Sequence, residues 1–294
     1  MGPKTSDSEE NGMWREFWNN SGRSFLYMLR QKWYALSIAI LLALVILGPM
    51  LNVFLWAFTE RWRYPDLLPS EWGLRFWADA FGRADIVQGF FTSIWVSLIV
   101  TGLSAAICLP AAYAFARMRF PGRTVLLLSF LTTNAFPRFG LYIAIAVIFF
   151  RLQLIGTVAG VVLIQLINTL LFMIWIPTAA FQGVDRSLEE AAMDVGASRL
   201  RVFIQITLPL VLPALAAALL LTFVGAFYET QGALLIGVPN VRTLPVVMIA
   251  LINNQVVVQY GAILSVALWV PSLILLVFAQ RVLRGGTLAS GFGV

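Results

Sequence analysis

The sequence predicts an all-α membrane protein, and three observations support this fold class. Of its 294 residues, 60% are hydrophobic and only 12% are charged. The apolar residues are gathered in long runs. A soluble fold of this length does not bury so much apolar surface, whereas a helix of about 20 apolar residues crosses the hydrocarbon core of a bilayer. The chain is therefore expected to cross a membrane several times.

Six apolar runs reach the required length and predict six transmembrane helices. Their expected bounds are Tyr34–Phe58, Gln88–Ala116, Thr124–Phe150, Thr157–Phe181, Leu210–Leu235 and Tyr260–Gln280. The chain is thus divided into an N-terminal segment (1–33), a first span (34–58), a loop (59–87), a core of five spans with their connectors (88–281) and a tail (282–294). Aromatic and basic residues alternate in the N-terminal segment, as is typical of an amphipathic helix lying in the headgroup region.

The distribution of basic residues predicts the orientation. A majority of the 20 Lys and Arg residues lie in the N-terminal segment, the "RMRFPGR" loop, the connector between the fourth and fifth spans, and the tail. Cytoplasmic loops carry an excess of Lys and Arg. Both termini are therefore expected in the cytoplasm and loop 59–87 outside it. Because topology explains the net charge of +6, no nucleic acid partner is expected.

The sequence lacks the residues that several kinds of chemistry require. The chain contains no histidine, and its single cysteine, Cys108, lies in an apolar run, so neither a metal site nor a disulfide is expected. An enzyme acting in the membrane needs a nucleophile with a base, or paired acids. An ion-coupled transporter, the other alternative, uses intramembrane carboxylates and structural repeats. Only one carboxylate, Glu229, lies inside a predicted span, and no repeat is evident.

The connector Ser187–Pro209, "SLEEAAMDVGASRLRVFIQITLP", is unusually polar for its position between two spans. Ser187 and Glu190 fit a capping box that begins a helix. Gly196 is suited to the left-handed residue that ends this helix, and Ser198 to the N-cap of a second helix. The connector is therefore expected to form a helix, a glycine turn and a helix in the cytoplasm.

The first of these helices has a narrow stripe of apolar side chains on one face. The stripe consists of Leu188, Ala191, Ala192 and Val195, at helical spacing. Such a stripe outside the membrane suits docking into a groove of another protein. The alternative is a solvated connector without a partner, because charged cytoplasmic connectors with capped helices are common.

The same connector resembles the signature of a known family. Glu190, Ala191 and Ala192, followed by Gly196 and then by the "ITLP" of residues 206–209, resemble the E-A-A, G and I-x-L-P signature of permease subunits of binding-protein-dependent ABC importers. The segments "AYAFARMRFPGR", "LQLIGTVAGVVL", "TLPV" and "QRVLRGGTLASGF" resemble the maltose-type carbohydrate branch of that family. The resemblance covers residues 85–294 approximately.

The resemblance implies a fold, partners and a mechanism. The fold is the type I ABC importer permease fold, in which the connector is a coupling helix seated in an ATPase. The implied partners are a second permease subunit, two ATPase subunits and an extracytoplasmic solute-binding protein, in a bacterial plasma (inner) membrane. The residues implied in ATPase coupling are Ser187, Glu190, Ala191, Ala192, Gly196, Leu208 and Pro209. Closure of the ATPases would switch the permease between inward-facing and outward-facing states.

The chain lacks the sequence of a nucleotide site. A Walker A loop requires Gly-x4-Gly-Lys followed by Ser or Thr. The lysines of the chain are Lys4 and Lys32, and neither lies in that setting. ATP and Mg²⁺ are therefore expected to bind a separate ATPase chain, and no cofactor is expected in this one.

A few polar residues inside the predicted spans are candidates for a solute path. They are Asn134, Asn168, Tyr228, Glu229 and Gln231. A charged side chain at mid-membrane costs about 3 kcal/mol, so it should face water, a partner or the bundle interior.

Two interpretations of these residues stay open. Glu229 lines a path for solute, or it pairs with Arg138, which follows Pro137 in the third span. Pro137 lacks an amide hydrogen and is expected to disrupt the helix there. Gln165 and Asn168 line the same cavity or make interhelical hydrogen bonds. Sugar permeases carry a similar Asn-Glu pair where this chain has Tyr228 and Glu229. The resemblance implies a carbohydrate solute; a polyamine or other charged organic solute is the alternative suggested by a lone carboxylate.

Overall fold

The computed structural model describes residues 33–63, 65–132, 137–255 and 257–285, with side chains except at 131, 132, 255 and 278–285. The chain forms two units, Met1–Leu55 and Trp56–Val294. Five helices in the described ranges are long and apolar enough to cross a membrane. They are Trp33–Ala57, Ala84–Arg117, Val158–Gly183, Arg199–Phe227 and Val258–Val277. The predicted all-helical membrane fold is confirmed, apart from one small β-ribbon.

The first unit contains most of the helix Trp33–Ala57, which corresponds to the first predicted span. Its sequence has no charged residue, and its 25 residues suffice to cross the hydrocarbon core. The second unit begins with an antiparallel ribbon of β1 (Thr59–Arg61) and β2 (Glu71–Trp72), followed by α2 (Arg75–Gly82). These elements occupy the loop predicted at 59–87.

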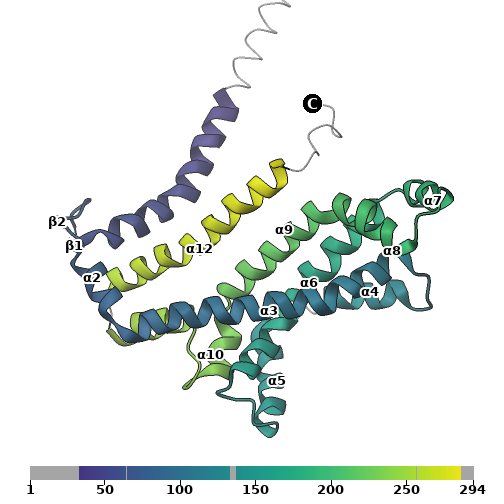
Figure 1. Ribbon diagram of the computed structural model, residues 1–294. Helices are drawn as coiled ribbons and strands as arrows, with labels where there is room; N and C mark the ends of the chain where they lie inside the picture. Colours follow the sequence, from purple (N-terminus) through teal and green to yellow (C-terminus); the bar gives the residue numbers. More distant parts are fainter. Residues whose placement is uncertain (1–32, 64, 133–136, 256, 286–294) are drawn as a thin grey trace, which may run out of the picture. The chain divides into compact units, whose positions relative to one another are not determined.

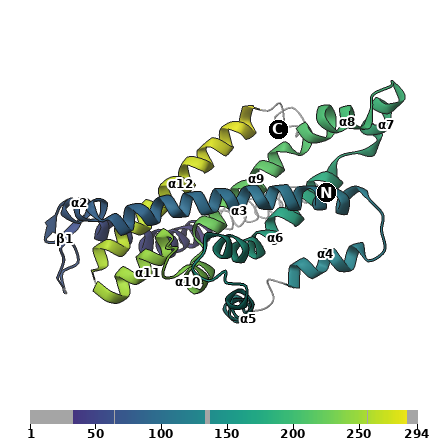
Figure 2. The same ribbon diagram turned by 60° about the horizontal axis from the view of Figure 1, so that its bottom comes forward.

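Three long helices form the core of the second unit. They are α3 (Ala84–Arg117), α6 (Val158–Gly183) and α9 (Leu208–Phe227), which pack against one another in both views of Figures 1 and 2. Val100 and Ile164 are fully buried where α3 meets α6. The hydroxyls of Ser104 and Thr169 are 2.5 Å apart and join the same two helices. Small and hydroxyl side chains allow this close approach, as in other membrane helix pairs.

The third predicted span, Thr124–Phe150, was expected to contain a disruption at Pro137, and the structure describes it as two helices on either side of residues 133–136. These helices are α4 (Arg123–Thr132) and α5 (Arg138–Arg151), drawn as separate helices in Figure 2. Pro137 is the N-cap of α5. Because proline has no amide hydrogen and restricts the residue before it, a helix readily begins at this position.

The fifth predicted span, Leu210–Leu235, is also interrupted. Helix α9 ends at Phe227 and α10 (Gln231–Gly237) begins after a break of three residues. Glu229 lies in this break. Its carboxylate accepts hydrogen bonds from the Gly232 and Ala233 amides, at 2.7 and 2.9 Å, which replaces the hydrogen bonds that a continuous helix would supply.

The other described elements follow in chain order. Between α6 and α9 lie α7 (Arg186–Asp194), α8 (Arg199–Val202) and the π-helical segment η1 (Phe203–Thr207). After α10, the chain forms α11 (Leu244–Gln255) and α12 (Val258–Gly285). Helix α11 was not predicted as a separate element. It is shorter than a membrane span, and it packs against α3 and α12.

Gly160 provides a test of the packing between α6 and α10. A Cβ at Gly160 would collide with the Leu154 carbonyl oxygen and would lie 2.9 Å from the Ile236 side chain. Since a backbone oxygen cannot move aside cheaply, Gly160→Ala is expected to lower stability by about 1–3 kcal/mol. The apparent melting temperature of the purified protein in detergent measures this loss.

Gly102→Ala on α3 is the matched control, because nothing lies within 4 Å of a Cβ at that position. There the change removes a flexible residue from a helix and is expected to be neutral or slightly stabilising. Equal melting temperatures for the two variants would contradict the close packing described at Gly160.

Candidate functional site

The segment from Asp185 to Val202, which we call the α7–α8 segment, lies beyond the ends of α6 and α9 in both ribbon views (Figures 1 and 2). Its helices begin at good N-caps. Asp185 caps α7 by accepting the Ser187 amide at 2.9 Å, and Ser198 caps α8 by accepting the Arg201 amide. The bond from Ser187 lowers the pKa of Asp185. The predicted cap at Ser198 is confirmed.

The predicted capping box of Ser187 and Glu190 was wrong. Helix α7 begins at Arg186, so Ser187 is already inside the first turn. Asp185 stands two residues earlier and is an equally good N-cap residue. The end of α6 at Gly183 sets where the chain turns, and this places Asp185 rather than Ser187 at the start of α7.

The turn after α7 matches the prediction. Gly196 has φ of 91°, a conformation that favours glycine. Its amide donates to the Met193 carbonyl at 2.9 Å, and the Ala197 amide donates to the Ala192 carbonyl at 3.0 Å. This pair of bonds is a Schellman motif. The turn fixes the direction of α8 relative to α7.

The outer face of α7 is accessible. No residue of α7 is buried, and the Leu188 side chain of the predicted stripe is 50% exposed, with Val195 at 86%. Glu190 and Ala191 are exposed, and Ala192 is half-buried. The residues of the E-A-A signature therefore lie on or beside a free surface.

Two predicted residues lie elsewhere. Leu208 and Pro209 form the first turn of α9. Leu208 packs against the buried cluster that contains Phe181 and Leu215, whereas Pro209 is exposed. Pro209 lies directly after the π-helical segment Phe203–Thr207, within the continuous helix Arg199–Phe227. In this structure the two residues lie at the start of α9 and do not extend the exposed face of α7.

The sequence did not identify the residues that hold α7 in place. Glu189 points inward and its Oε1 accepts a bond from the Arg117 guanidinium at 2.8 Å and from the Thr207 hydroxyl at 2.6 Å. Arg117 is the last residue of α3. An arginine at the end of a long apolar run, followed much later by two adjacent glutamates, was the available signal. It did not indicate which glutamate faces inward.

A second candidate site is a polar cavity of about 530 Å³ inside the helix bundle. Its walls come from α5, α6, α9, α10, α11 and the break after α9. The lining residues are Arg138, Tyr142, Asn168, Thr169, Phe172, Thr222, Gly225, Tyr228, Glu229, Thr230, Gln231 and Ile249. The structure thus brings together Asn168, Tyr228, Glu229 and Gln231 of the predicted path. Asn134 lies outside the described residues.

Several lining groups of this cavity are fixed by hydrogen bonds. The Asn168 amide donates to the Tyr142 hydroxyl. The Tyr228 hydroxyl donates to the Leu268 carbonyl of α12 at 3.0 Å. Gln165 is buried and is not among the lining residues. The cavity therefore has a preformed polar wall, and Tyr142 is a lining residue that the sequence did not indicate.

Glu229 serves a structural purpose and still lines the cavity. Both of its oxygens accept amides at the start of α10. A carboxylate has about four lone-pair sites, so further acceptor capacity remains toward the cavity. Arg138 lines the same cavity from α5. Both charged groups thus line the same polar cavity, which agrees with the energetic requirement for charges inside a membrane.

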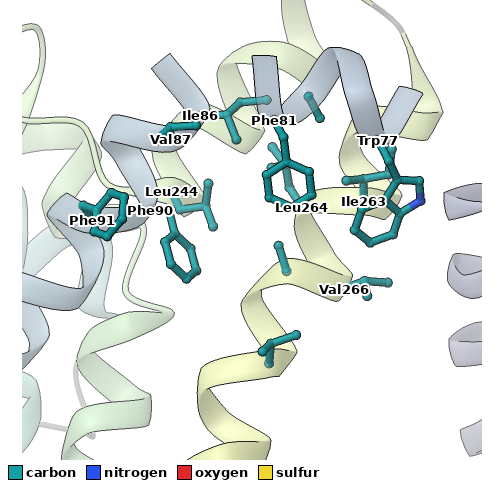
Figure 3. A pocket seen from close by; sticks show the side chains of 13 residues that line it. Trp77, Phe81, Ile86, Val87, Phe90, Phe91, Leu244, Ile263, Leu264 and Val266 are labelled. Atoms are coloured by element: carbon teal, nitrogen blue, oxygen red, sulfur yellow. The ribbon is translucent and has the colours of Figure 1, made fainter. Parts of the chain in front are cut away.

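A third cavity, of about 340 Å³, is lined by apolar side chains and is drawn in Figure 3. It lies between α2, α3, α11 and α12. Its wall includes Phe90 and Phe91 on one side of the view in Figure 3, and Trp77 beside Ile263 on the other. It presents apolar surface almost exclusively, so its walls offer no groups that would recognise a polar solute.

The sequence of this chain is similar to a protein family and to known transport proteins. A family model described as "Binding-protein-dependent transport system inner membrane component" matches residues 99–285. The diacetylchitobiose uptake system permease protein NgcG of Streptomyces coelicolor is 30% identical over 262 residues, which are 85% of each chain. The maltose/maltodextrin transport system permease protein MalG of Escherichia coli K12 is 35% identical over 210 residues, 67% of this chain and 71% of MalG.

The fold also matches a solved structure. A chain of a bacterial alginate ABC transporter, solved in complex with an alginate pentasaccharide-bound periplasmic protein, superposes with a TM-score of 0.68 at 16% identity. The match covers 92% of this chain and 98% of that chain. At this identity the likeness establishes the fold alone, which is the importer permease fold expected from the sequence. With the family match and the two relatives, it follows that the chain belongs to the inner membrane components of binding-protein-dependent transport systems.

Proposed function

We propose that this chain is the permease subunit of an ATP-driven importer for a carbohydrate. The names of both relatives refer to oligosaccharide systems, one for diacetylchitobiose and one for maltose and maltodextrins. These names favour a carbohydrate over the polyamine alternative. Membership of a binding-protein-dependent family disfavours an ion-coupled carrier. The chain moves solute across the membrane, and the chemical step, ATP hydrolysis, belongs to a partner.

The proposed partner site is the α7–α8 segment, which acts as a coupling helix on an ATPase. The observation that carries this proposal is the exposed face of α7, where Leu188, Glu190 and Ala191 are accessible. Small side chains allow a helix to approach a groove closely, and Glu190 offers a charge for a basic partner residue. The Schellman turn at Gly196 keeps α8 in a fixed direction.

The remaining partners follow from the same proposal. The α7–α8 segment and both termini lie in the cytoplasm, as the Lys and Arg distribution favours. ATP and Mg²⁺ bind two ATPase subunits, and a solute-binding protein delivers sugar to the opposite side. A second permease subunit completes the path. The polar cavity then holds the solute during transfer, with Asn168, Tyr228 and Gln231 supplying hydrogen bonds to hydroxyl groups.

The docking role of Glu190 is tested by Glu190→Lys. The charge reversal on the exposed face of α7 is expected to reduce the ATPase that co-purifies with the membrane complex by about tenfold or more. The amount of this chain in the membrane should stay at the wild-type level, because no described contact inside the chain depends on Glu190. Quantitative immunoblotting of isolated membranes measures the amount of this chain, and immunoblotting of the purified complex measures the ATPase that accompanies it.

Asp79→Lys is the matched control for Glu190→Lys. It makes the same charge change at an exposed residue of α2, which is far along the chain from the α7–α8 segment. Asp79→Lys should retain the ATPase. Wild-type amounts of ATPase in the Glu190→Lys complex would rule out docking through this face.

The polar cavity is tested by filling it. Nothing lies within 4 Å of a Cβ at Gly225, which lines the cavity. Gly225→Phe is therefore expected to fold and to obstruct the cavity, lowering sugar uptake at least about tenfold. Gly225→Ala adds only a methyl group and should keep uptake near the wild-type level. Uptake of radiolabelled maltose and diacetylchitobiose by cells measures the effect, and normal uptake by Gly225→Phe would place the path elsewhere.

A further inference from the structure

The link that joins α7 to the membrane helices consists of Arg117, Glu189 and Thr207. The Arg117 side chain is only 9% exposed and that of Glu189 is 18% exposed. Thr207 is 1% exposed. An ion pair on an open surface is weak, because water screens it. Removal of one partner from a largely buried pair is far more damaging, because the other charge stays desolvated. Loss of either partner of this pair is therefore expected to be costly.

The link connects three separate parts of the chain through one carboxylate oxygen. Glu189 Oε1 accepts from Arg117 at the end of α3 and from Thr207 in η1, immediately before α9. The same Arg117 nitrogen also donates to the Val184 carbonyl at 3.2 Å, next to the start of α7. A movement of α3 relative to α9 must therefore displace or rotate α7.

The guanidinium of Arg117 has few other attachments. Its Nε is buried and has no hydrogen-bond acceptor within the described part of the chain. Glu189 is the carboxylate that pairs with it there. The side-chain bonds that hold the Arg117 guanidinium are therefore those to Glu189 and Val184. The Arg186 guanidinium at the start of α7 also donates to the Arg117 carbonyl, at 3.4 Å, so the guanidinium of Arg117 and its backbone both attach α7 to the end of α3.

The attachment at η1 adds a second feature. Residues Phe203–Thr207 form a π-helical turn between α8 and α9. Such turns are rare, less regular than an α-helix, and frequent at functional sites. Thr207 ends this turn and bonds across to Glu189. The α7–α8 segment and α9 are thus joined by the helical run Arg199–Phe227, which contains this π-helical turn, and the side-chain bond from Thr207 braces the turn against α7.

We propose that Arg117, Glu189 and Thr207 form a positioning link that transmits movement between α7 and the transmembrane helices. This inference rests on the proposed function, in which α7 docks an ATPase. In this proposal, two adjacent carboxylates have different roles. Glu190 faces outward to the partner, and Glu189 faces inward and ties α7 to α3 and α9. Loss of the link leaves the ATPase docked but disconnects it from the solute cavity.

The test measures whether a change of state of the ATPase alters the accessibility of the polar cavity. Gln231→Cys places one reactive thiol in the cavity wall, since Gln231 is exposed and the native Cys108 is buried. The complete transporter in liposomes, binding protein included, is labelled with a charged maleimide, with and without Mg-ATP and vanadate. Mg-ATP and vanadate together trap the ATPase in one state. In the Gln231→Cys complex without further substitutions, this trapping is expected to change the labelling rate of the introduced thiol about tenfold.

Three variants distinguish transmission from simple structural damage. Glu189→Gln and Arg117→Met are each expected to reduce the change in labelling rate to about twofold or less. The double variant pairs two neutral side chains and should fold well. It should lose no more than either single variant, because both residues act through one interaction. All three should co-purify the same amount of ATPase as wild type, in contrast to Glu190→Lys.

The outcomes separate this inference from the proposed function. A wild-type labelling response in Glu189→Gln overturns the link, as does additive loss in the double variant. Loss of the ATPase from Glu189→Gln also overturns it, because Glu189 would then serve docking. If the complex with intact Glu189 and Arg117 co-purifies no ATPase or shows no response to trapping, the proposed function fails and the link fails with it.

Discussion

Backbone hydrogen bonding inside an apolar membrane is the constraint on which the rest of this structure depends. No water is available in the hydrocarbon region, so each amide and carbonyl needs a partner within the protein. Long continuous helices such as α3 and α6 meet this requirement directly. Where α9 stops, the Glu229 carboxylate supplies acceptors for the first amides of α10. An interrupted helix is thus tolerated where a polar side chain is available and the interruption faces a polar cavity.

This constraint explains why the polar cavity lies where it does. The break between α9 and α10 requires a carboxylate, and a carboxylate in turn requires a polar environment. Tyr228, beside Glu229, bonds to the Leu268 carbonyl and ties the break to α12. The groups that stabilise the interrupted helix are therefore the groups that give the cavity its polar wall. A structural role and a solute-binding role for Glu229 are compatible rather than exclusive.

Much of the fold was predictable from sequence, because apolar length determines a membrane span. The predicted span Gln88–Ala116 and the helix α3 differ by only a few residues at each end. Pro137 predicted a disruption within the third span, and α5 begins directly after it. The orientation of Glu189 was not predictable. Adjacent helix residues point about 100° apart, and Arg117, which selects Glu189, is 72 residues away in sequence.

A single helix relates the two candidate sites to each other. Helix α9 has 20 residues and is therefore roughly 30 Å long. Thr207, immediately before it, bonds to Glu189 of α7, whereas Thr222 and Gly225 near its other end line the polar cavity. Helix α9 packs along α3 and α6. Although it contains Pro213, its helical run is unbroken from Leu208 to Phe227, and packed helices of this kind shift against their neighbours. Displacement of α7 therefore reaches the cavity wall along α9 itself, without a chain of rearranged side chains between the two sites.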